Sequence, residues 1–116
     1  MSGNPDSLNV SEWKKVINIV ENQPTRDLSL FILRSLANSQ QVSYHSIAAF
    51  RGEVTEELEH VGQQLNTYVS TITRAVKKVC DIRGDATWYI WHTTDKAWVI
   101  SWSNLRTLRK ALGAVS

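Results

Sequence analysis

The chain has 116 residues, of which 42% are hydrophobic and 21% are charged, values typical of a single globular domain. We expect a flexible leader over residues 1–9, because turn-forming and small residues predominate there, and one domain over residues 10–114. The sequence contains no basic and apolar signal segment and no run of about 18 apolar residues that would span a membrane. We therefore expect a cytoplasmic protein that makes no membrane contact.

Charge is distributed unevenly along the chain, although the net charge is only +2. Residues 1–64 contain five basic and eight acidic residues, a net charge of −3, whereas residues 65–116 contain eight basic and three acidic residues, a net charge of +5. Such asymmetry favours an anionic partner for one face of the molecule.

Three helices are predicted in the first half of the chain. The first runs from Ser11, a good N-cap residue, to Asn22 before Pro24, and its apolar residues recur at helical spacing: Trp13, Val16, Ile17 and Val20. The second begins after Thr25, and its inward face comprises Leu28, Phe31, Ile32 and Leu36, with Leu33 beside them. The third is short, from Ser43 to Arg51, and Gly52 suits a left-handed C-terminal cap.

A long helix over residues 64–80 has the clearest periodicity, with apolar residues four, three, four and three positions apart: Leu65, Val69, Ile72, Val76 and Val79. Aromatic and β-branched residues then predict a β-hairpin with strands at 87–92 and 97–102. A last helix follows Ser103, with Leu105, Leu108 and Leu112 facing inward and Gly113 at its end. The predicted fold class is mainly α with a C-terminal β-hairpin, that is, α+β.

Residues 28–102 resemble the winged helix-turn-helix superfamily. Three segments carry the resemblance, namely VSYHSIAAFRG, LNTYVSTITRAVKKV and the hairpin TWYIWHTTDKAWVISW. The resemblance implies a winged helix with additional N- and C-terminal helices. It also implies that the long helix enters the major groove of DNA, while the hairpin acts as a wing on the neighbouring backbone.

The long helix has chemistry suited to DNA, because no carboxylate occurs between Leu65 and Cys80. Hydroxyl and amide groups can approach phosphates or base edges, and Arg and Lys add positive charge. The side of this helix opposite its apolar residues, with two flanking positions, comprises Gln63, Thr67, Ser70, Thr71, Arg74, Lys77 and Lys78. Further candidates are Thr94 and Lys96 in the wing, and Ser43 and Tyr44 at the start of the short helix.

The hypothesis is a transcriptional regulator that binds double-stranded DNA, as a homodimer. The alternative is a protein-interaction adaptor with the same fold, contacting its partner through the Trp-rich hairpin or the acidic segment 53–59. The first and last helices either complete the core or form a dimer seam. The strip of Arg106, Arg109 and Lys110 is either a second basic surface or an ordinary helix C-terminus.

No enzyme is predicted. His45, His60 and His92 lack the spacing of metal ligands, and no nucleotide-binding or nucleophile motif occurs, so neither a cofactor nor a metal is expected. The single cysteine, Cys80, excludes an internal disulfide. Its apolar neighbours favour a buried thiol over a reactive one activated by Lys77 and Lys78.

Overall fold

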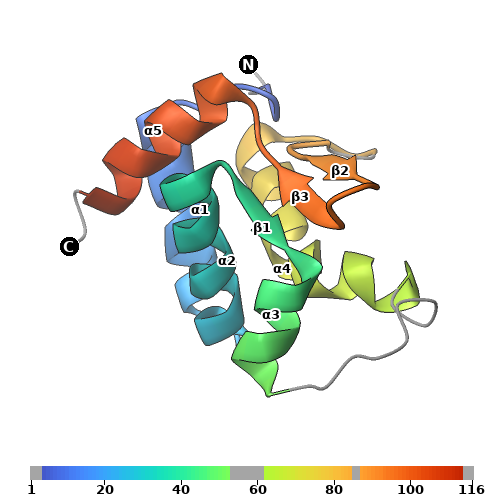
Figure 1. Cartoon of the computed structure of the whole chain (residues 1–116). Helices are drawn as coiled ribbons and strands as arrows, with labels where there is room; N and C mark the ends of the chain where they lie inside the picture. Colours follow the sequence, from blue (N-terminus) through green and yellow to red (C-terminus); the bar gives the residue numbers. More distant parts are fainter. Residues whose placement is uncertain (1–3, 53–61, 85–86, 114–116) are drawn as a thin grey trace.

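The computed structural model describes residues 4–52, 62–84 and 87–113, and over 62–68 it describes the course of the backbone alone. Within these residues the fold is α+β, mostly helical with a small antiparallel sheet (Figure 1). Its elements are α1 (Val10–Glu21), α2 (Arg26–Ser39), β1 (Gln41–Ser43), α3 (Tyr44–Arg51), α4 (Gly62–Cys80), β2 (Ile90–His92), β3 (Ala97–Val99) and α5 (Trp102–Gly113).

The N-cap of helix α1 lies two residues earlier than expected, at Asn9 rather than at Ser11. The Asn9 side chain accepts a hydrogen bond from the backbone N–H of Glu12 at 2.7 Å, and the Glu12 carboxylate accepts one from the backbone N–H of Asn9 at 2.9 Å. The predicted inner face is confirmed, since all four of its residues are buried: Trp13, Val16, Ile17 and Val20.

Helix α2 follows Thr25, as expected, but the Thr25 hydroxyl does not cap it. That hydroxyl instead forms a 3.0 Å hydrogen bond with the hydroxyl of Thr71 on α4. The buried face of α2 includes Ile32, Leu33 and Leu36, whereas Leu28 and Phe31 are only partly buried. The core face is therefore rotated slightly from the one that the sequence predicts.

Strand β1 was not predicted. Gln40 ends α2 in the left-handed conformation, with φ 67°, and the chain then runs extended beside β3. The backbone N–H of Ile100 donates to the carbonyl of Gln40 at 3.1 Å, and the Gln40 side chain donates to the carbonyl of Ile100 at 3.0 Å. Only Val42 of this strand is apolar and buried, so its sequence carries little strand signal.

The sheet has the order β1-β3-β2, and both pairings are antiparallel. Val42, Trp98 and Trp91 lie opposite one another across the three strands. Trp98 is buried, and the half-buried ring of Trp91 meets it edge-on with ring centroids 4.9 Å apart. This row is the inner face of the sheet.

The predicted strands of the hairpin were too long at both outer ends. β2 begins at Ile90, so the alternation of side chains does not extend back to Trp88: Trp88 is buried, whereas Ile90 is 67% exposed. β3 ends at Val99, and Trp102 begins α5 with 61% of its side chain exposed. Of the four tryptophans in the predicted hairpin, Trp88 and Trp98 therefore belong to the core.

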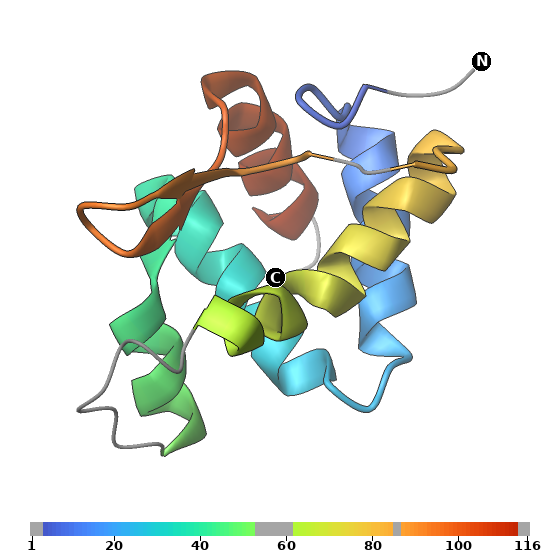
Figure 2. The same cartoon turned by 90° about the vertical axis from the view of Figure 1, so that its right-hand side faces the viewer.

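Helices α1 and α5 pack against each other within one chain (Figure 2). Of the two arrangements that the sequence left open for these helices, a completed core and a dimer seam, the structure therefore shows the first. Their inward residues, including Leu105 and Leu108, are buried within the single chain. Arg109 also has a structural role. Its guanidinium donates to the carbonyls of Ala37 at 2.5 Å and Asn38 at 3.3 Å, which stabilises the C-terminal end of α2.

Residues 4–9 are fixed to α5, and so they do not form the loose leader that the sequence favours. Leu8 is fully buried. The buried side chain of Asn104 accepts a hydrogen bond from the N–H of Leu8 at 2.8 Å and donates one to the carbonyl of Pro5 at 2.9 Å. Thr107 donates to the carbonyl of Leu8 at 2.6 Å. The domain therefore extends further toward the N-terminus than residue 10.

This anchoring predicts that Asn104→Ala lowers the free energy of unfolding by about 2 kcal/mol, because the buried N–H of Leu8 loses its acceptor. Urea denaturation followed by tryptophan fluorescence measures the change. Asn18→Ala, on the exposed side of α1, is the matched control and should change stability by less than about 0.5 kcal/mol. Equal stability of both variants would contradict the anchoring role.

Candidate nucleic-acid interface

Helix α4 packs against α1 and α2 and presents its other side at the surface of the molecule (Figure 2). The predicted inner face is confirmed where side chains are described: Val69, Ile72 and Val76 are buried and Val79 is partly buried. Leu65 lies outside the residues whose side chains are described. The orientation expected from the apolar spacing is therefore the one that the helix adopts.

Two hydrogen bonds fix the rotation of α4. The indole N–H of Trp88 donates to the hydroxyl of Thr73 at 2.9 Å, and Thr71 bonds to Thr25. The ring of Trp88 also meets Trp13 edge-on, with centroids 6.3 Å apart. Sequence reasoning missed the role of Thr73, because its indole partner lies 15 residues away and outside the helix.

The candidate residues of α4 whose side chains are described divide into three groups. Arg74 and Lys78 are exposed, Lys77 and Ser70 are half-buried, and Thr71 is 8% exposed. Thr71 faces α2, so its hydroxyl is committed within the protein, and we correct its assignment to the surface. The side chains of Gln63 and Thr67 lie outside those that the structure describes.

Lys96 lies in the four-residue connection between β2 and β3, in the left-handed conformation with φ 49°. Its carbonyl accepts a hydrogen bond from the N–H of Tyr44 at 2.8 Å, which ties the hairpin to the start of α3. Thr94 is exposed, and Asp95 lies 3.1 Å from Nδ1 of His92. The hairpin therefore offers one lysine whose backbone is held in place.

The start of α3 is less accessible than the sequence predicts. Ser43 does cap this helix, since its hydroxyl accepts from the N–H of Ser46 at 3.1 Å and also bonds to the Ser46 hydroxyl at 2.8 Å. Tyr44 is 1% exposed, and its N–H is bonded to Lys96. Tyr44 is therefore a core residue, which corrects its assignment as a phosphate contact.

The two surfaces that the sequence suggested for a protein partner, the Trp-rich hairpin and the acidic segment, also differ from expectation or lie outside the described residues. Trp88 and Trp98 are buried, so the hairpin presents less aromatic surface than its sequence predicts, although Trp102 remains exposed. The acidic segment 53–59 lies outside the described residues.

Within the part of the chain that the structure describes, no group of three or more His, Cys, Asp and Glu side chains is placed to hold a metal ion, and no helix is long and apolar enough to cross a membrane.

Searches against family models, curated proteins and solved structures found no match to this chain. The functional argument therefore depends on the geometry and chemistry of its own residues.

Cys80 lies at the end of α4 and is fully buried, as its apolar neighbours predict. Burial raises the pKa of its thiol above the usual range, and the nearby carboxylate of Glu12 raises this pKa further. Both effects disfavour the nucleophilic thiolate. Cys80 is therefore a structural side chain, despite the two lysines that precede it.

We expect the native chain to react with a thiol reagent such as Ellman's reagent at least about 100-fold more slowly than the chain in denaturant, because reaction requires local opening. The absorbance of the released thiolate follows the reaction. The unfolded chain, which exposes one thiol, serves as the control. Equally fast reaction of the native chain would contradict the buried assignment.

Proposed function

We propose that this chain is a winged-helix protein that binds double-stranded DNA and acts as a transcriptional regulator, with α4 in the major groove and the β2–β3 hairpin as the wing. The observation that carries the proposal is that Arg74 and Lys78 are exposed on a surface helix that contains no carboxylate. The half-buried Lys77 lies between them in the sequence. Basic residues clustered on one face of a helix are typical of a surface that contacts nucleic-acid phosphates.

The arrangement of the elements supports this reading. From α2 to β3, the helices α2, α3 and α4 precede the β2–β3 hairpin, which is the order that the family resemblance implies. Strand β1 pairs with β3 and joins the hairpin to the helical core. Lys96 in the wing would contact the backbone beside the groove that α4 occupies.

The direct test is the double variant Arg74→Ala with Lys78→Ala. We expect affinity for a random duplex at low salt to fall by at least about tenfold, and the slope of log K against log salt to lose about two units, because two phosphate contacts disappear. Fluorescence anisotropy of a labelled duplex measures both quantities. Both side chains are exposed, so circular dichroism should show an unchanged fold.

The matched control is Arg106→Ala with Lys110→Ala, which removes the same charge from exposed positions on α5. Its salt slope should remain close to that of the unmodified chain. An equal loss in both double variants would indicate attraction by net charge alone, and no loss in the α4 variant would refute the site. A chain that leaves the duplex unbound at low salt would favour the adaptor alternative.

A separate prediction concerns the wing. Lys96→Gly removes a charge and also relieves the left-handed backbone strain at this position, so stability should stay equal or rise by up to about 1 kcal/mol. Duplex affinity should nevertheless fall by about threefold, with a salt slope smaller by about one unit. Thermal unfolding and anisotropy together separate the two effects. An unchanged salt slope would exclude Lys96 from the interface.

A further inference from the structure

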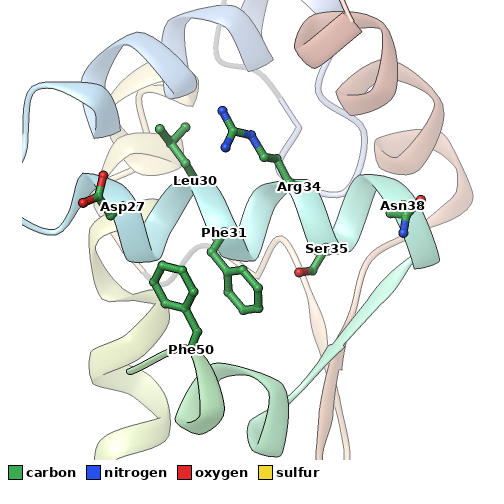
Figure 3. Close-up of a pocket in the computed structure, with 7 residues that line it drawn as sticks. All are labelled: Asp27, Leu30, Phe31, Arg34, Ser35, Asn38 and Phe50. Atoms are coloured by element: carbon green, nitrogen blue, oxygen red, sulfur yellow. The ribbon is translucent and has the colours of Figure 1, made fainter. Parts of the chain in front are cut away.

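The outer side of α2 has a row of residues at helical spacing that the DNA-binding proposal does not use. We name this row the α2 stripe, and it consists of Asp27, Leu30, Phe31, Arg34 and Asn38. Figure 3 shows these side chains along α2, with Phe50 of α3 beside them. The stripe lies opposite the buried residues of the same helix, of which Ile32, Leu33 and Leu36 are fully buried. It is therefore an outward-facing surface.

The middle of the α2 stripe is apolar. Leu30 and Phe31 are only partly buried, and Phe50 is 47% exposed. The rings of Phe31 and Phe50 are stacked, with centroids 4.4 Å apart and planes 10° from parallel. A groove of about 590 Å³ runs over these residues. Contiguous exposed apolar side chains with polar residues at their edges are typical of an interaction surface.

The charges of the α2 stripe are arranged symmetrically about this apolar middle. Asp27 lies 3.5 residues before the midpoint between Leu30 and Phe31, and Arg34 lies 3.5 residues after it. With a rise of 1.5 Å per residue, each charge is about 5 Å from the midpoint along the helix axis. The two charges have opposite signs, so the stripe is complementary to a reversed copy of itself.

We propose that two copies of this chain form a twofold-symmetric dimer through antiparallel α2 helices, with the axis at the midpoint between Leu30 and Phe31. Asp27 of each copy then faces Arg34 of the other copy, because the twofold axis brings two positions that lie equally far before and after the midpoint to the same height. The axis also places Leu30 against Leu30 and Phe31 against Phe31, with Phe50 covering the aromatic side. The occupant of the groove is thus a second copy of the chain.

Two further observations favour a second copy over an unrelated partner. Within one chain Asp27 has only a 3.5 Å contact with Arg26, and both side chains are largely exposed, so that pair is weak. Arg34 has no ionic partner among the described residues and is available to the other copy.

The test uses charge reversal in the full-length chain. Sedimentation velocity should show a concentration-dependent dimer with a dissociation constant on the order of 10–100 µM, as expected for a small interface. Arg34→Asp alone and Asp27→Arg alone should each weaken dimerisation by at least about tenfold, because each places like charges opposite each other twice. The double variant should restore it to within about threefold of the original value, since the pairs re-form with their signs exchanged.

Arg106→Asp, with the same charge change on α5, is the control and should leave dimerisation unchanged. Both reversed side chains are exposed, so circular dichroism should show that every variant folds. Asp27→Arg also changes the charge in the first turn of α2, where the helix dipole acts. This effect is equally present in the double variant, so it cannot explain a recovery of dimerisation there. A chain that stays monomeric at about 500 µM, well above the expected dissociation constant, would overturn the proposal. A dimer insensitive to Arg34→Asp, or a double variant no better than the single ones, would also overturn it.

Discussion

The packing of Trp88 determines how α4 sits on the rest of the molecule. Its indole N–H has its acceptor in Thr73, and its ring meets Trp13 of α1 within the core. Leaving a buried N–H without an acceptor costs about 1–3 kcal/mol, so a rotation of α4 that moves Thr73 away from the indole is disfavoured. Arg74 follows Thr73 directly and is directed outward as a consequence. The functional proposal therefore depends on a contact inside the core.

The two proposed surfaces belong to different sides of the molecule and do not compete. α4 packs against the buried side of α2, where Thr71 meets Thr25, whereas the α2 stripe faces away from that contact. A dimer formed through the stripe would thus leave both copies of α4 free. If α4 contacts DNA as proposed, two copies of it related by a twofold axis would suit the pseudo-palindromic sites that many DNA-binding dimers recognise. The two proposals nevertheless rest on different residues and can fail separately.

The features that depend on the spacing of apolar residues within one segment were predicted from the sequence. The helices, the inner face of α1 and that of α4 follow from apolar spacing, and Ser43 and Gly52 act as the caps that their chemistry favours. Features set by distant contacts were not predicted. β1 exists because β3 pairs with it. Tyr44 is buried, with its backbone N–H bonded to the hairpin, and the hydroxyl of Thr71 is bonded to that of Thr25. Of the candidate site, the charged residues remain at the surface, whereas these two polar ones do not.

The most direct test of the central claim, that the outer side of α4 meets DNA, is an amide NMR titration of the ¹⁵N-labelled chain with a random duplex at low salt. The account predicts that shift changes concentrate in α4 around Arg74 and Lys78 and in the hairpin near Lys96, while amides of the α2 stripe remain unchanged. Changes confined to α5 or to α2, or no changes at a duplex concentration that saturates ordinary non-specific binders, would contradict it.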